Sequence, residues 1–186
     1  MMWGIASQRT LVRERLKLLL AGHDSEIKPV ELTAEPGALL LRQGMPAEQV
    51  FLLIAGAVAI QVRQGEGEPH TMAIVEAEDL LGEVGLFGNG VHSADVRVLD
   101  APAQLIAVDG NDLLKALLFD TDLSVELLSL ISQRCLQSND VMGLLLDGIQ
   151  AAHSGDQPAL ERTCEALRLR DHSLARAADR LRELAR

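Results

Sequence analysis

The spacing of apolar residues changes twice along the chain. Residues 7–21 interleave leucines with charged residues, which predicts a short amphipathic helix. From residue 29 to about residue 108, short apolar runs alternate closely with turn residues, a pattern typical of an all-β module. After Asp109 the apolar residues recur at helical intervals of three and four. The predicted order is a helix, many short strands and then further helices.

Six of the short runs have the length and composition of strands. In one of them Val58, Ile60 and Val62 alternate with smaller or polar residues, so that strand should bury one face. The predicted strands cover residues 38–42, 50–54, 57–63, 72–75, 93–98 and 104–108. Polar turns are predicted at residues 43–46 and 65–68.

Two helices are predicted directly after the last strand. Asn111 or Asp112 would cap a short helix that ends at Leu118. Thr121 or Asp122 would cap a longer one.

The C-terminal part predicts one more helix. Gly148 and then residues 154–156 are expected to interrupt the long helix, and Pro158 suits the first turn of a helix that begins near Gln157. Its apolar stripe consists of Leu160, Cys164, Leu167, Leu174 and Leu181. We expect this stripe to pack within the molecule, against a second copy or against a protein partner.

The predicted fold class is α+β, a double-stranded β-helix (a jelly-roll-like β-roll) flanked by N-terminal and C-terminal helices. The predicted division is an N-terminal helical segment at residues 1–28, a β-roll with a short following helix at 29–118, a long helix at 119–150 and an extra amphipathic helix at 151–186.

Composition and charge narrow the function. The chain has 186 residues, 48% of them apolar and only 2% aromatic, so its core must be aliphatic. The net charge is −10, and residues 1–155 carry 21 acidic against 10 basic residues. DNA is not expected as a partner, because an acidic body repels phosphate backbones and few rings can stack on bases.

The cysteines and the longest apolar runs indicate the cellular compartment in which the protein is expected. Cys135 and Cys164 lie 29 residues apart with no CxxC motif, which indicates reduced thiols that we expect to be buried. No apolar run approaches the ~20 residues of a membrane helix, and the N-terminus does not read as a signal peptide. We expect a cytoplasmic protein without a membrane partner, a metal site or a required cofactor.

The glycine-rich stretch at residues 81–94 holds the candidate chemistry. Gly82 and Gly85 would let the backbone pass close to a bound group. Glu83 offers a carboxylate that can accept hydrogen bonds from sugar hydroxyls. Residues 84–87 can form one helical turn, whose first amides would face an anion.

Two donors, His92 and Ser93, complete this stretch. Together with its surroundings it resembles the phosphate-binding cassette of cyclic-nucleotide-binding domains, in particular of catabolite-activator-type bacterial regulators. The resemblance covers about 110 residues, from Glu31 to Asn139. Residues 40–44 and 50–58 are similar to the family's opening strands, residues 82–87 to its GE-x-G-L-F cassette and residues 112–139 to its short and long helices.

The resemblance implies a regulatory protein in cellular signalling, not an enzyme, with cAMP or cGMP as its ligand. Glu83 would hold the ribose 2′-hydroxyl, and Ser93 with the neighbouring amides would meet the cyclic phosphate. Ser138 and Asn139 fall where the family's long helix contacts the purine. The implied ligand-binding residues are Gly82, Glu83, Val84, Gly85, His92, Ser93, Ala94, Ser138 and Asn139.

His92 departs from the family's pattern, which has an arginine directly before this Ser-Ala pair. Arginine clamps phosphate with a permanent charge and two hydrogen bonds. Histidine carries about half a charge or less at neutral pH. A charge-assisted pair is worth about 1.5–3 kcal/mol, so its loss predicts roughly 10- to 150-fold weaker binding. From the residues alone, His92 could equally be an exposed loop residue.

Three functions remain open at this stage. The first is a sensor that couples a cyclic nucleotide or related anion to repositioning of the helices. The second is a degenerate fold that serves as a protein-interaction or dimerisation scaffold. The third is a transcription regulator, although the ~36 residues after Gln150 predict one helix and not a winged helix-turn-helix. We expect a homodimer, formed through the long helix or the helix at residues 157–185.

Overall fold

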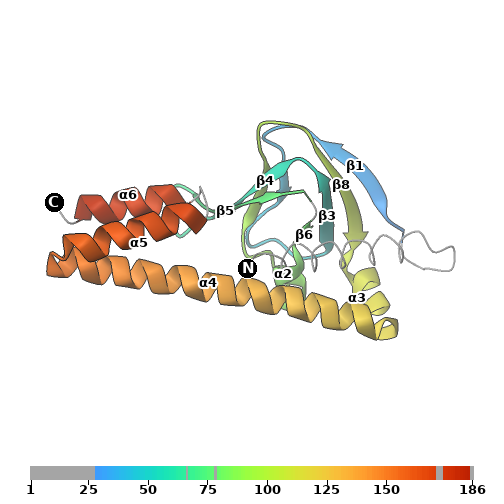
Figure 1. The fold of residues 1–186 in the computed structure, drawn as a ribbon. Helices are drawn as coiled ribbons and strands as arrows, with labels where there is room; N and C mark the ends of the chain where they lie inside the picture. Colours follow the sequence, from blue (N-terminus) through green and yellow to red (C-terminus); the bar gives the residue numbers. More distant parts are fainter. Residues whose placement is uncertain (1–27, 66, 78, 171–173, 185–186) are drawn as a thin grey trace. The chain divides into compact units, whose positions relative to one another are not determined.

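The computed structural model describes residues 28–65, 67–77, 79–170 and 174–184 (Figure 1). They form two compact units. Of the described residues, those up to Thr71 and from Val75 to Leu130 form the β-roll unit, and residues 72–74 with those from Ile131 onward form the helical unit. The predicted helix at residues 7–21 lies outside the described part. Of the helices that are described, none has the length and hydropathy to cross a membrane.

The β-roll consists of two four-stranded sheets whose paired strands run antiparallel. The first sheet has the order β1-β8-β3-β6 and the second the order β2-β7-β4-β5. The strands are β1 Val30–Ala34, β2 Leu39–Leu41, β3 Gln49–Ala55, β4 Ala57–Val62, β5 His70–Glu76, β6 Asp79–Leu81, β7 Asp95–Val98 and β8 Ala103–Asp109. This architecture confirms the predicted α+β class and the jelly-roll-like β-roll.

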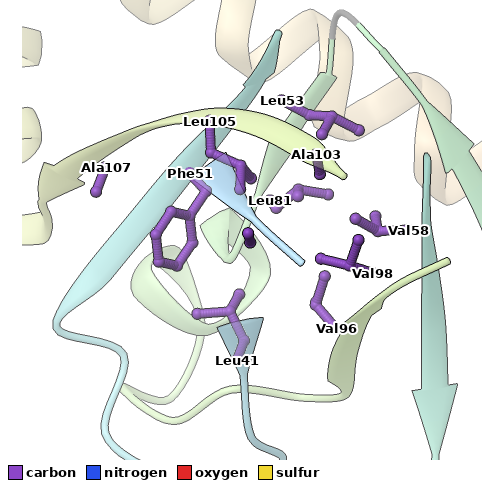
Figure 2. Packing of buried hydrophobic residues seen from close by; sticks show 11 residues of the cluster. Leu41, Phe51, Leu53, Val58, Leu81, Val96, Val98, Ala103, Leu105 and Ala107 are labelled. Atoms are coloured by element: carbon purple, nitrogen blue, oxygen red, sulfur yellow. The ribbon is translucent and has the colours of Figure 1, made fainter. Parts of the chain in front are cut away.

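Strand β3 is apolar on both faces, and this places it at the centre of the unit. Phe51 and Leu53 point into the cluster between the two sheets (Figure 2). Val50 and Leu52 point the other way, because successive side chains of a strand alternate. They pack with Leu113 and other helical residues in a second cluster. Fully burying one such side chain contributes about 1.5–3 kcal/mol.

Two helices follow the roll, and their caps differ from the prediction. Helix α3 (Gly110–Phe119) is capped by Asp109, whose carboxylate accepts hydrogen bonds from the amides of Asn111 and Asp112 at 2.9 and 3.2 Å. Helix α4 (Thr121–Ser154) follows Asp120, whose carboxylate accepts from the amide of Leu123 at 2.9 Å.

Each cap thus lies one to three residues before the expected position, so Asn111, Asp112, Thr121 and Asp122 are not the capping residues. A carboxylate directly before the first turn is the geometry that satisfies the open amides there.

Gly148 does not interrupt α4, contrary to the prediction, and is buried inside it. A Cβ at this position would lie 2.6 Å from Leu181 Cδ1 and 3.2 Å from Thr163 Cγ2. The missing side chain therefore gives room to the two helices that pack on α4. The predicted break at residues 154–156 is confirmed, since α4 ends at Ser154.

The expected single C-terminal helix is two helices. They are α5 (Gln157–Arg170) and α6 (Ala175–Leu184), which run antiparallel beside the end of α4 (Figure 1). Ion pairs link them to each other and to α4, namely Arg182 with Glu161, Arg168 with Asp179 and Arg170 with Asp140. Each exposed pair contributes at most about 1 kcal/mol, so packing dominates.

The stripe predicted for the last helix is an intramolecular core. Leu160, Cys164 and Leu167 are 0–1% exposed and cluster with Ala151 and Leu181. The expectation that both cysteines are buried is correct for Cys164 and wrong for Cys135, which is exposed on α4. The helical unit thus uses this stripe within one chain.

Candidate functional site

Residues 82–94, here called the cassette, connect β6 to β7 and contain the short helix α2 (Glu83–Phe87). Gly82 precedes this helix with φ 92°, a conformation that favours glycine. A Cβ there would lie 3.0 Å from Leu41 Cδ1 and 3.1 Å from the carbonyl oxygen of Gln49. The predicted helical turn is confirmed, and Gly82 lets it start close to two neighbouring strands.

Gly85 brings the two ends of the cassette together. A Cβ there would lie 2.6 Å from the carbonyl oxygen of Val91 and 3.0 Å from the Cβ of Ala47. The amide of Gly90 donates to the carbonyl of Gly85 at 3.0 Å and closes the loop. The two glycines thus make room for the chain's own backbone, and contact between their amides and a ligand stays a prediction.

Glu83 is only 2% exposed, although it is a carboxylate in a loop. A solvated surface role is therefore excluded for it, and burial of a charged group is costly unless polar groups compensate. Its neighbour Val84 is 53% exposed, Ser93 is exposed and Ala94 is buried. The cassette thus presents Val84 and Ser93 outward and keeps Glu83 within the fold.

His92 is buried, with 6% of its surface exposed, so its interpretation as an exposed loop residue is wrong. Its backbone is fixed on both sides, because its amide donates to the Met45 carbonyl and its carbonyl accepts from the Gly44 amide, both at 2.8 Å. A Cβ on Gly82 would lie 3.5 Å from Cε1 of the His92 ring, and the buried Nδ1 has no hydrogen-bond partner. Burial lowers the pKa of His92 below its ordinary value near 6.5. Burial therefore favours the neutral form of the ring.

The turn at residues 43–47 holds the cassette in place, a role that the sequence did not reveal. The amide of Ala47 donates to the carbonyl of Gly90 at 2.9 Å. The amide of Gln43 donates to the Asp95 carboxylate at 2.7 Å. Gly44, which has φ 81°, indicates the turn in the sequence. Nothing in the sequence indicates that this turn packs against the cassette.

The structure brings some of the predicted site residues together and leaves two on another unit. The cassette residues are neighbours by sequence, and His92 joins Gly82 through the fold. Ser138 and Asn139 are exposed on the part of α4 that belongs to the helical unit. Their contact with a purine stays a prediction. Within the described ranges, no group of three His, Cys, Asp or Glu side chains could hold a metal ion.

The lowered pKa of His92 predicts a loss of stability on acidification. The unfolded chain takes up a proton near pH 6.5, whereas the folded chain does so only at lower pH. The contribution of His92 is thus complete above pH 6.5 and is lost as the pH falls below it. Urea unfolding at pH 7.5 and 5.5 should show this fall, and His92→Gln should reduce it. His153→Gln, at an exposed position on α4, should leave it as in the wild type.

Comparisons with known proteins agree with this architecture. Residues 31–118 match the family "Cyclic nucleotide-binding domain". A "CRP-like cAMP-activated global transcriptional regulator" of Mycobacterium tuberculosis is 22% identical over 128 residues, which are 68% of this chain and 55% of that protein. An "Anaerobic regulatory protein" of Bacillus subtilis is 29% identical over 121 residues, 63% of this chain and 50% of that protein. This chain thus spans about half the length of these curated relatives.

A solved structure extends the likeness of fold further along the chain. The Thermus thermophilus catabolite activator protein superposes with a TM-score of 0.61 at 17% identity, covering 92% of this chain and 94% of that one. At this identity the likeness concerns the fold alone.

Proposed function

Because residues 31–118 belong to the cyclic nucleotide-binding domain family and are homologous to regulators of the CRP type, we propose that the chain is a regulatory sensor module. Its ligand is a cyclic nucleotide, cAMP or cGMP, or a related small anion. The ligand binds at the cassette, and binding changes the balance between two packings of the helices. The named relatives are regulators, which supports a role other than catalysis.

Buried Glu83 is the observation that carries the proposal. It sits at the first residue of α2, directly after Gly82 in its left-handed conformation. In the cyclic nucleotide-binding family a glutamate at this place accepts hydrogen bonds from the ribose. A carboxylate that is desolvated beforehand makes stronger hydrogen bonds than one in water, and this supports ligand binding here.

Calorimetric titration with cAMP and with cGMP tests the proposal. We expect saturable binding, and a ligand at 100 times its Kd would stabilise the fold by about 2.7 kcal/mol and raise Tm. Glu83→Gln keeps the shape of the side chain and should weaken binding at least tenfold. Glu48→Gln, at an exposed position of the same unit, is the matched control and should bind as the wild type does. The absence of both binding heat and a Tm shift at millimolar nucleotide would contradict the proposal that the chain is a nucleotide sensor.

A second function, a scaffold that has lost the nucleotide, is favoured by one observation. Residues 64–96 contain no lysine or arginine. His92 stands at the position where the family has an arginine, and burial favours its neutral form. The next cation, Arg97, donates from Nη1 to the Gly37 carbonyl at 2.7 Å. Micromolar binding by the wild type would exclude the scaffold.

The remaining partners follow from these alternatives. We propose a homodimer in either case. Transcription regulation is the third and least favoured function, because the acidic body gives DNA binding no general electrostatic help. A cytoplasmic location would suit all three functions.

A further inference from the structure

The chain reverses direction between α4 and α5 within two residues, Gly155 and Asp156 (Figure 1). Gly155 has φ 70°, and the amide of Asp156 donates to the carbonyl of Ala151 at 3.0 Å, which closes the end of α4. A cavity of about 380 Å³ lies beside this turn and is open to solvent. It is lined by the last two turns of α4 and the first two of α5, so it belongs wholly to the helical unit.

Short side chains line this cavity from both helices and leave room between them. Ala151 of α4 and Ala159 of α5 contribute only a methyl group each. Ser154 and Thr163 bond to their own helices, since the Ser154 hydroxyl donates to the Ala151 carbonyl at 3.3 Å and the Thr163 hydroxyl to the Ala159 carbonyl at 3.0 Å. The space lies in the range of roughly 300–1,000 Å³ that is typical of small-molecule sites.

Three other side chains of the cavity are polar, exposed and unpaired among the described residues. They are Asp147 and Gln150 on α4 and Arg162 on α5. The ion pairs of the helical unit use three other arginines. Arg162 shares the cavity with two carboxylates, those of Asp147 and Asp156, and forms no ion pair with either. The Asp156 carboxylate instead accepts from the Ala159 amide at 3.0 Å. The cavity therefore holds opposite charges apart.

This charge arrangement selects a ligand that carries both signs. A ligand with only negative charges meets repulsion from Asp147, and one with only positive charges meets repulsion from Arg162. A free α-amino acid has one charge of each sign. Its carboxylate fits the planar fork of Arg162, which binds carboxylates through two hydrogen bonds, and its ammonium group fits the Asp147 carboxylate. Gln150 offers an amide donor and an amide acceptor to a polar side chain of the ligand.

We propose that this cavity binds a free α-amino acid, or a zwitterion of similar size, with its carboxylate at Arg162, its ammonium group at Asp147 and its polar side chain at Gln150. The site adds a second ligand to the proposed function and does not depend on nucleotide binding. A ligand that contacts both α4 and α5 stabilises the helical unit. The charged groups are exposed and exposed ion pairs are weak, so we expect a Kd of roughly one millimolar.

Calorimetric titration and thermal melting of the full chain, without nucleotide, test the proposal. The probes are glycine, which carries the two charges alone, and L-glutamine, which adds an amide for Gln150. We expect saturable binding and a higher Tm with both, and tighter binding of L-glutamine. No binding of either probe at tens of millimolar overturns the proposal.

Two blocked forms of L-glutamine test the recognition of each charge. N-acetyl-L-glutamine lacks the ammonium group and L-glutamine methyl ester lacks the carboxylate. Each should bind at least tenfold more weakly than L-glutamine, because each loses one charge-assisted pair. A blocked form that binds as tightly as L-glutamine overturns the zwitterion as the ligand.

Variants of the full chain locate the site. Arg162→Gln and Asp147→Asn should each weaken binding of L-glutamine about tenfold, the lower end for a charge-assisted pair, because both groups are exposed. Arg176→Gln and Glu165→Gln, at exposed positions outside the cavity, are the matched controls and should bind as the wild type does. Glu83→Gln should also bind L-glutamine normally, so failure of this site is distinguishable from failure of the sensor. Unchanged binding in both cavity variants, or its loss in Glu83→Gln, overturns the proposed site.

Discussion

Replacing His92 by arginine is expected to strengthen cyclic-nucleotide binding by roughly 10- to 150-fold. The neutral, buried imidazole offers no charge to the cyclic phosphate, whereas arginine would restore a charge-assisted pair worth about 1.5–3 kcal/mol. The guanidinium sits on a longer stem and stays charged at any physiological pH. Calorimetric titration with cAMP and cGMP, beside the wild type, measures the gain. Circular dichroism on the same samples shows that the variant is folded.

The pH dependence of nucleotide binding shows whether His92 contacts the ligand directly. An anion beside the ring favours the imidazolium, so wild-type affinity should rise as the pH falls from 7.5 to 6. His92→Arg should lose this dependence, and His92→Gln should lose it without gaining affinity. Equal affinity of all three proteins at every pH would show that residue 92 does not meet the ligand. Binding by the arginine variant alone would identify the wild type as the scaffold.

The sequence predicted the strands well where apolar residues form a distinct run. Strands β3, β4 and β8 lie within one or two residues of their predicted ranges, because each buries several consecutive or alternating side chains. Strand β1 was missed, since it is the end strand of its sheet and four of its five residues are not buried. Strand β6 was also missed, because three residues are too few to show a period.

The helical part shows where local rules are insufficient. Glycine is typical of a helix break, and this led to the wrong prediction at Gly148. In the fold, the side chains of Leu181 and Thr163, from other parts of the chain, occupy the space beside it. The apolar stripe after residue 157 indicated one helix with a free face. The chain instead folds back after α5, and both helices bury their share of the stripe. Only the tertiary packing decides between these arrangements.

In the candidate site, too, some features can be predicted from a short stretch of sequence and others depend on distant parts of the chain. Gly82, Glu83 and Gly85 lie within one motif of six residues, so the sequence alone singles them out, and their contact with a ligand stays a prediction. The residues that crowd the two glycines, Leu41, Gln49 and Ala47, come from other parts of the chain. Burial of His92 depends on the turn at residues 43–47, and residue type alone does not reveal it. The exposure of Cys135 is a similar case, because it reflects which face of α4 the rest of the chain covers.

Replacing Gly85 by alanine is expected to destabilise the protein by about 1–3 kcal/mol, the usual cost of forcing an extra group into a packed site. The new Cβ would lie 2.6 Å from a backbone carbonyl oxygen, that of Val91, and 3.0 Å from the Cβ of Ala47. Neither is the far end of a flexible side chain, so α2 or the end of the cassette has to move. Urea unfolding measures the loss, and nucleotide titration should show weaker binding because the cassette is displaced.

Gly143→Ala is the matched control, because it makes the same chemical change inside a helix where a Cβ would meet nothing within 4 Å. Alanine is the better helix former by about 1 kcal/mol, so this variant should gain up to that amount of stability. The two substitutions should therefore move stability in opposite directions. If Gly85→Ala also gained stability, the close approach of Val91 to Gly85 would not be a constraint on the cassette, and the loop would have room for a side chain. Opposite signs would instead show that the close approach of Val91 and Ala47 to Gly85 constrains the cassette.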